Sequence, residues 1–213
     1  MKREDITVIF GAVQVSPVEM AESVLSLCLD ELGGSLGSYF VPLEFDSASD
    51  SYEPKEELLD LNGREDLMNR VRGLSNCLWR CHINLGIASG YVYPAVFLEP
   101  SGTQATTLLL LIEGKITRFI EENEETRIPL FVSLCRFAAA VGADSFFSGL
   151  YIDEWKPLDK AQVFERGELG PMPFCLAWKP ATINEKKLQA QLEIPADGIV
   201  ETLTGYRLVD LIV

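Results

Sequence analysis

The spacing of apolar residues predicts that the chain opens with a strand followed by a helix. Ile6 to Val13 is a short, mostly apolar run and predicts the strand. The next residues, Ser16-Pro17-Val18-Glu19, favour a helix start, because Ser16 and Glu19 can cap each other's backbone amides and proline suits the first helical position. Apolar residues then recur at helical spacing up to Leu32, and Gly33-Gly34 ends the helix.

The pattern then changes to one that is typical of an antiparallel sheet. Tyr39 to Phe45 predicts a second strand, and an acidic, serine-rich loop follows from Asp46 to Pro54. Leu58 to Leu61 fits neither a helix nor a strand clearly. Arg64 to Leu74 has helical spacing. Strict alternation from Trp79 to Ile87 predicts a half-buried strand with one polar face, and two more strands complete a meander at residues 91–98 and 106–112.

The second half of the chain is richer in helices. Arg127 to Val141 is apolar nearly all round and predicts a helix packed centrally. Further expected elements are a short helix at 116–120, strands at 150–155 and 174–178, a helix at 183–192 and a last hairpin at 199–203 and 207–212. Blocks of strands and helices, without strict alternation, predict an α+β fold: a mainly antiparallel sheet packed against several helices, in a single domain spanning residues 1–213.

Net charge is the compositional feature that bears most on function. The chain has 32 acidic and 18 basic residues, giving a formal net charge of −14 over 213 residues. Such a field repels nucleic acid and membrane surfaces of the same sign, and it attracts basic partners. With 47% hydrophobic residues, the chain can still bury a sizeable core, so the acid excess belongs to a folded surface.

The cysteines and the N-terminus indicate a cytoplasmic protein. Five cysteines lie scattered in apolar stretches, an odd number that favours reduced, buried thiols. The residues after Met1 include two bases and two acids without a small-residue cleavage site, and the longest apolar run, Leu108 to Ile112, is far too short to span a membrane.

No catalytic or metal-binding group is evident in the sequence. His82 is the one histidine, and strand alternation would place it and Cys81 on opposite faces, which leaves Cys77, Cys81 and His82 poorly arranged as metal ligands. We therefore expect no catalytic residues, no metal and no cofactor. Neighbouring carboxylates such as Asp153-Glu154 leave open an alternative, a small cytosolic hydrolase that uses carboxylates and a divalent cation.

The acidic residues concentrate in one part of the sequence. From Glu44 to Asp66 there are nine acids against Lys55 and Arg64, with a tyrosine among them. Such a segment offers steering charge and an aromatic anchor, although it could equally be a solvated face that only confers solubility. The residues that we expect to face a partner are Asp46, Asp50, Tyr52, Glu53, Glu56, Glu57 and Asp60, with Glu121 and Glu122 from a second acidic cluster.

The order of landmarks along most of the chain resembles immunity protein family fifty-two of bacterial polymorphic toxin systems. The landmarks are the serine-started helix, Tyr39-Phe40-Val41, the polar-faced strand at 79–87, the strand at 91–98, the leucine strand before Glu113-Gly114, the long helix before Ala143-Asp144, Phe174 to Trp178 and the terminal hairpin. Among its members, the chain is most similar to immunity partners of type VI secretion nuclease effectors. The Trp155-Lys156-Pro157 segment departs from the pattern.

The resemblance implies a function as well as a fold. Members of this family are α+β proteins that neutralise a cognate toxin by direct binding, and the family supplies no catalytic residues. A toxin that cuts nucleic acid needs a basic channel, which an acidic inhibitor can occlude. We therefore expect a monomeric cytoplasmic protein whose partner is a toxin of this kind. An adaptor that dimerises through a sheet edge is a third possibility.

Overall fold

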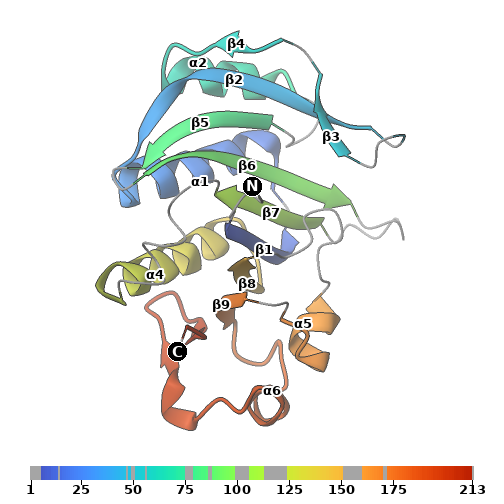
Figure 1. Cartoon of the computed structure of the whole chain (residues 1–213), viewed down its shortest axis with the longest axis vertical. Helices are drawn as coiled ribbons and strands as arrows, with labels where there is room; N and C mark the ends of the chain where they lie inside the picture. Colours follow the sequence, from blue (N-terminus) through green and yellow to red (C-terminus); the bar gives the residue numbers. More distant parts are fainter. Residues whose placement is uncertain are drawn as a thin grey trace.

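The computed structural model describes residues 6–13, 15–46, 48, 51–55, 57–74, 79–85, 88–98, 106–112, 124–150, 160–169 and 172–212. Its centre is an 11-stranded sheet in which every pairing is antiparallel (Figure 1). The strands are β1 (Ile6–Val13), β2 (Ser35–Asp46), β3 (Ser51–Pro54), β4 (Leu59–Asp60), β5 (Trp79–Leu85), β6 (Ala88–Leu98), β7 (Thr106–Ile112), β8 (Ser145–Leu150), β9 (Met172–Trp178), β10 (Ile199–Glu201) and β11 (Arg207–Asp210).

The strand order shows how the chain builds this sheet. It runs β10-β11-β9-β8-β1-β7-β6-β5-β2-β3, and β4 pairs with β2 off this path. Strands β5, β6 and β7 form the predicted meander, and β1 lies between β7 and β8. The first strand therefore joins the meander to the C-terminal strands. The predicted α+β class with a mainly antiparallel sheet is confirmed.

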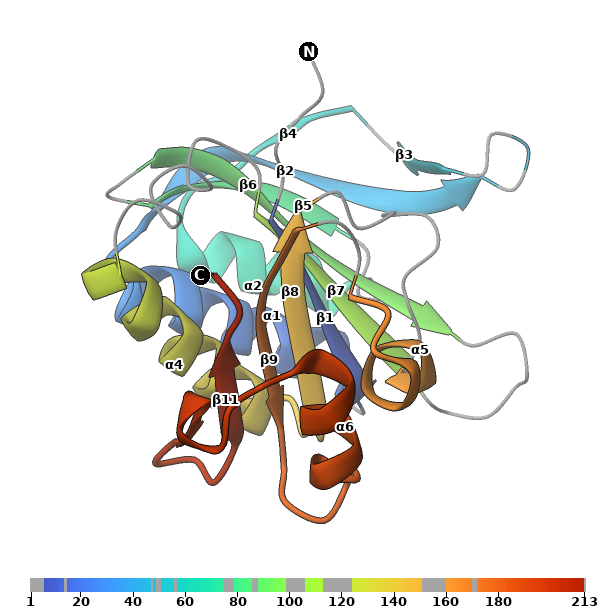
Figure 2. The same cartoon turned by 60° about the horizontal axis from the view of Figure 1, so that its bottom comes forward.

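Helices cover both faces of the sheet. Figure 2 shows α1 (Pro17–Leu25), α2 (Arg64–Arg72) and α4 (Glu124–Ala140) on one side, with α5 (Lys160–Arg166) and α6 (Glu185–Leu192) on the other. A π-helical segment, η1 (Ser26–Glu31), continues α1, and a short 3-10 turn, η2 (Ala196–Gly198), precedes β10. Among the described helices, none is long and apolar enough to cross a bilayer.

Alternating residues of the C-terminal strands feed two separate cores. Phe146 and Ala177 are paired across β8 and β9 and pack with α1, α2 and α4. The neighbouring pair, Phe147 and Leu176, packs instead with α5 and α6. Successive side chains of a strand point to opposite faces, so a strand covered on both sides must be apolar at every position. This explains the uninterrupted apolar run of Phe174 to Trp178, each residue of which is buried.

The start of α1 forms as its sequence predicts. The Ser16 hydroxyl accepts a hydrogen bond from the Glu19 amide at 3.3 Å, and Glu19 Oε2 accepts one from the Ser16 amide at 2.8 Å. This reciprocal cap lowers the pKa of Glu19, first through the backbone hydrogen bond from Ser16. The helix also ends at the predicted glycines, but its last residues adopt the π-helical form, with the Leu32 amide donating to the Leu27 carbonyl at 3.0 Å.

Several predicted elements need correction. The serine-rich segment predicted as a loop contains β3, which pairs with the end of β2. The strand β8 at Ser145–Leu150 was not predicted beyond its last residue, and α5 has no counterpart among the predicted elements. The helix α4 is not central: Ile128, Arg136 and Ala139 are exposed on its outer face. The helix expected at 116–120 and residues 151–155 lie outside the described residues.

The C-terminal hairpin, β10–β11, is fastened to the rest of the molecule by polar contacts. Arg127 Nε on α4 donates to Asp210 Oδ2 on β11 at 2.8 Å, and both side chains are largely buried. The buried Tyr206 hydroxyl donates to the Ala143 carbonyl just before β8. A buried pair stabilises only while both partners remain, because removal of one leaves an uncompensated charge. The predicted hairpin at the C-terminus is therefore part of the sheet and is held by α4.

We predict that Gly37→Ala destabilises the protein, because strand β2 passes very close to β5 at this residue. A Cβ atom there would lie 2.8 Å from Cβ, Nδ1 and the carbonyl oxygen of His82, and the backbone oxygen cannot move aside alone. We expect the free energy of unfolding to fall by about 1–3 kcal/mol, measured by urea denaturation. Ser38→Ala, at the exposed neighbouring residue, is the control. An alanine variant as stable as the wild type would contradict this close approach.

Candidate functional site

The acidic segment predicted as an interface lies along one edge of the sheet. Strand β3 pairs with the second half of β2, and β4 pairs with its middle, at Tyr39↔Asp60 and Phe40↔Leu59 (Figure 1). Both strands are very short and follow β2 at the end of the strand order. Residues 44–46, 51–55 and 57–62 are therefore collected at this edge, and we call them the acidic edge.

The described interface candidates lie where they can meet a partner. Glu53, Glu57 and Asp60 are exposed, and Asp46 at the end of β2 is partly exposed. The backbone of Tyr52 lies in β3, opposite Phe45, but its side chain is outside the described part of the structure. The remaining candidates, Asp50, Glu56, Glu121 and Glu122, also lie outside the described residues.

The register of the β2–β3 hairpin places like charges opposite each other. Glu44 and Glu53 are direct cross-strand partners, so their side chains share one face of the hairpin. Lys55 Nζ lies 3.5 Å from Glu44 Oε1, but both of these side chains are more than half exposed, so the ion pair contributes little. The two glutamates therefore place two exposed carboxylates on one face of this hairpin.

Arg70 fastens the acidic edge to α2. Its Nη2 donates to the Asp60 carbonyl at 2.7 Å and its Nε to Asp66 Oδ1 at 3.1 Å, while Asp66 Oδ2 accepts from the Asn62 amide at 2.9 Å. The Asn62 amide and then Arg70 lower the pKa of Asp66. The connection between β4 and α2 is therefore fixed, and the exposed side chains of Glu57 and Asp60 project from a defined backbone.

An exposed leucine in the acidic edge was missed by the sequence analysis. Leu58 is 64% exposed, whereas Leu59 is half-buried and Leu61 is buried. The signal lay in the strand period: in Leu58-Leu59-Asp60-Leu61, alternation places Leu58 on the same side as the exposed Asp60. A leucine among acids combines an apolar contact with a charged rim, which is the composition of protein-binding patches.

Acidic residues are not confined to this edge. At the opposite end of the molecule Glu165, Glu193 and Asp197 are also exposed. Arginines neutralise some carboxylates there, where Arg207 Nη1 lies 2.7 Å from Glu201 Oε2 and Arg166 Nε lies 3.6 Å from Glu168 Oε1, as Lys55 neutralises Glu44 at the acidic edge. The surplus charge is thus broadly spread, and the acidic edge is distinguished by its opposed glutamates and its exposed leucine.

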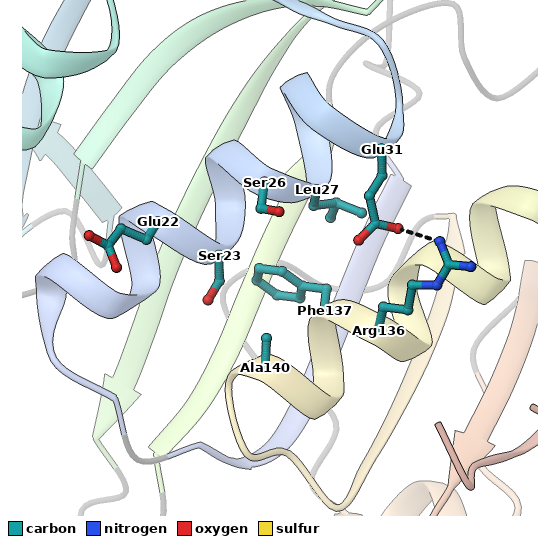
Figure 3. Close-up of a pocket in the computed structure, with 8 residues that line it drawn as sticks. All are labelled: Glu22, Ser23, Ser26, Leu27, Glu31, Arg136, Phe137 and Ala140. Atoms are coloured by element: carbon teal, nitrogen blue, oxygen red, sulfur yellow. Dashed lines mark hydrogen bonds and ion pairs between the residues drawn. The ribbon is translucent and has the colours of Figure 1, made fainter. Parts of the chain in front are cut away.

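A groove between α1–η1 and α4 is a second candidate site. It has a volume of about 240 Å³ and is lined by Glu22, Ser23, Ser26, Leu27, Glu31, Arg136, Phe137 and Ala140. Figure 3 shows Glu22 and Glu31 at its two ends, with the Phe137 ring between them. Glu31 Oε2 accepts from Arg136 Nη1 at 3.2 Å across the gap between the helices. The sequence analysis did not predict this groove, because its two walls are more than one hundred residues apart in the chain.

The described cysteines belong to the core. Cys28, Cys81, Cys135 and Cys175 are free and buried, as predicted, and Cys77 lies outside the described residues. Burial raises the pKa of Cys28 and of Cys135 to about 12. Thiols in this state are poor nucleophiles and poor metal ligands. Within the described ranges, no group of three or more histidine, cysteine or acidic residues is arranged to hold a metal ion.

His82 faces away from the cysteine that precedes it, as strand alternation predicts. Cys81 is fully buried, whereas His82 is partly exposed and its ring stacks on Tyr39, with 5.8 Å between ring centroids and an angle of 11° between the planes. Cys81 and His82 therefore do not form a pair of metal ligands. Histidine and tyrosine instead form one stacked contact between β5 and β2.

Comparison with known proteins leaves the family open. No family model matches the chain, and no curated protein matches it either. A solved structure of a type VI secretion system (T6SS) protein from Pseudomonas aeruginosa is similar, with a TM-score of 0.49 and 10% sequence identity over 97% of this chain. The match covers 65% of that protein, so the chain spans less than two thirds of its length. The resemblance to immunity protein family fifty-two stays a prediction.

We predict that Asp66 makes stability depend on pH in the acid range. Its pKa in the folded chain is lowered, so its carboxylate stabilises the fold above the unfolded pKa of about 4, and this contribution is lost as the pH falls through the folded pKa. Asp66→Asn should therefore flatten the acid limb of stability against pH, measured by urea unfolding between pH 7 and pH 2. Glu65→Gln, at the exposed neighbour, should leave the acid limb as steep as in the wild type. If the stability of the Asp66→Asn variant falls as steeply with pH as that of the wild type, the contacts of Asp66 with Arg70 and Asn62 do not cause the pH dependence.

Proposed function

We propose that this chain is a binding protein that neutralises a secreted toxin with a basic active-site channel, and that the acidic edge is its contact surface. The observation that carries the proposal is Leu58, a leucine with 64% of its surface exposed, held beside the exposed carboxylates of Glu57 and Asp60. Singly exposed leucines are common, but one that stands among acids on a fixed sheet edge offers a partner both an apolar anchor and charge.

The chemistry of the partner follows from the charge. A nuclease holds the phosphate backbone with lysine and arginine side chains, so its substrate channel is cationic. A protein of formal net charge −14 is attracted to such a channel, and carboxylates along an edge can lie where phosphates would otherwise bind. Inhibition by occlusion of the channel needs no catalytic residue in the inhibitor.

The two kinds of side chain contribute differently to binding. Exposed ion pairs are worth about 0.2–1 kcal/mol each, and they act mainly on the rate of association. Burial of a leucine is worth about 1.5–3 kcal/mol and acts mainly on the rate of dissociation. We therefore assign steering to Glu53, Glu57 and Asp60, and anchoring to Leu58. The short edge strands suit this role, because they present side chains without offering a long row of unpaired backbone groups.

The landmarks that resemble immunity protein family fifty-two support the same function, because its members neutralise toxins by binding. On this proposal the chain acts in the cytoplasm as a monomer, makes no contact with nucleic acid or membrane, and catalyses no reaction. The partner is the nuclease domain of an effector encoded beside it, of the kind delivered by type VI secretion.

We predict that reversing three edge charges slows association with the toxin. The variant carries Glu53→Lys, Glu57→Lys and Asp60→Lys, and the toxin is the product of the gene adjacent to its own. The association rate at low salt should fall by about 10- to 100-fold, with a smaller effect at high salt, measured by surface plasmon resonance.

The matched control reverses three exposed acids at the far end of the molecule, with Glu165→Lys, Glu193→Lys and Asp197→Lys. The change in net charge is the same, so only the location differs. If both triple variants slow association equally, the effect is one of total charge, and the edge is not the contact surface. Growth of cells that co-express the toxin gives the functional readout.

We predict that Leu58→Ser weakens toxin binding by about 30-fold, mainly through faster dissociation, because the substitution removes the apolar anchor. Leu203→Ser is the matched control, since Leu203 is 99% exposed in the turn between β10 and β11 at the other end of the sheet. Both variants replace an exposed leucine and should fold normally. Equal affinities for the Leu58 variant and the wild type would place the anchor elsewhere.

A further inference from the structure

The groove between α1–η1 and α4 has the chemistry of a pocket for one basic side chain. We propose that it binds a single arginine or lysine side chain of a protein partner and thereby forms a second contact, beyond the acidic edge. This inference rests on the proposed function in one respect, that the partner is a basic protein. The size, lining and position of the groove favour such an occupant.

The size of the groove limits what can occupy it. Its volume of about 240 Å³ is below the roughly 300–1,000 Å³ of pockets that bind cofactors or drug-sized ligands. It is also open along the surface between two helices (Figure 3). A single long side chain that enters from outside fits such a site better than a free metabolite, which needs enclosure on most of its surface.

The lining selects a cation with an apolar stem. Phe137 and Leu27 are 2% and 1% exposed, so they form an apolar floor. The hydroxyls of Ser23 and Ser26 line the groove, and among the described residues neither hydroxyl has a hydrogen-bond partner. Lysine and arginine carry methylene stems that pack on apolar surface while the charged end meets acceptors. The methylene stem can pack on Phe137 and Leu27. The serine hydroxyls can accept hydrogen bonds from the N–H groups at the end of the side chain.

The charges at the two ends of the groove favour the same occupant. Arg136 is the one basic residue in the lining, and Glu31 already pairs with it at 3.2 Å. Glu22 at the other end is exposed and forms no ion pair with any described residue. In Figure 3 the Glu22 carboxylate points away from Phe137, so it adds negative charge at the rim of the groove and lies apart from the apolar floor. An anionic ligand would meet this carboxylate and would have to compete with Glu31 for the arginine.

An ion pair joins the η1 wall of the groove to α2. Asp30, the residue before Glu31, lies 3.3 Å through its Oδ2 from Arg64 Nη1, at the first residue of α2. Helix α2 is the helix that Arg70 joins to the acidic edge. One wall of the groove is the π-helical segment η1, and π-helical turns are frequent at functional sites. A partner large enough to cover the edge can thus reach the groove across α2.

The test uses the full chain and two capped tripeptides, acetyl-Gly-Arg-Gly-amide and its citrulline counterpart, which has nearly the same shape but no charge. We expect the arginine peptide to shift the amide NMR signals of residues 22–31 and 136–140 in a saturable manner. The citrulline peptide should bind about two- to fivefold more weakly, since it loses the attraction to the glutamates of the groove. Equal shifts from both peptides, or shifts elsewhere only, would overturn the proposal.

Two variants locate the site. Ala140→Phe fills the groove and should weaken binding of the arginine peptide at least about tenfold, whereas Ala139→Phe adds the same ring at the adjacent exposed residue and should have no effect. Glu22→Gln keeps the shape and should weaken binding about two- to fivefold, with Glu125→Gln on α4 as its control. Unchanged binding by Ala140→Phe or by Glu22→Gln would overturn the proposal.

A second arm separates this inference from the proposed function. The adjacent-gene toxin is measured against the wild type, Ala140→Phe and Ala139→Phe. A toxin that binds all three proteins equally would overturn the groove as a contact and leave the proposed function standing. Specific binding of the arginine peptide by a chain that does not bind the toxin would support the groove and reject the proposed function.

Discussion

The fold depends on burial of the sheet from both sides. In β8, β9 and β11, neighbouring residues such as Phe146 and Phe147 or Leu208 and Val209 belong to different cores. Each fully buried large side chain contributes about 1.5–3 kcal/mol, so strands that fill two cores supply much of the stability. They also fix the register, because a shift by one residue would exchange the two sets of side chains. The helices on both faces are needed to cover these strands. The proposed contact surfaces lie outside the two cores.

A sheet that is covered on both faces leaves its two edges for other purposes. One edge ends in β3 and β4, and the other ends in β10. An unprotected edge invites pairing with other chains, and short strands with charged residues reduce this risk. Glu53 and Asp60 therefore suit the edge on structural grounds, independently of the proposed binding of a partner.

The elements that depend on neighbouring residues were predicted from the sequence. The elements that depend on contacts between distant segments were not. The cap of Ser16 and Glu19 and the alternation from Trp79 to Leu85 depend on neighbours in the chain, and both were predicted correctly. Strand β3 was predicted as a loop, because only its pairing with β2 makes it a strand. The acidic residues of the edge were predicted to face a partner from their charge alone. The strand pairings that bring them together were not predicted. The groove was missed because residues near Glu22 and Arg136 meet only after folding.

The arrangement of charge separates an interface from a merely solvated face more clearly than its amount does. On the proposed function, the exposed acids Glu44 and Glu53, which face each other across the β2–β3 hairpin, add to the negative potential of this edge. Leu58, held outward beside Asp60, is the apolar part of the same proposed contact. Both features become favourable once a cationic surface covers them, since the repulsion is then screened and the leucine is buried. In the groove, likewise, Glu22 and the serine hydroxyls lie around an apolar floor, and none of them pairs with a side chain among the described residues.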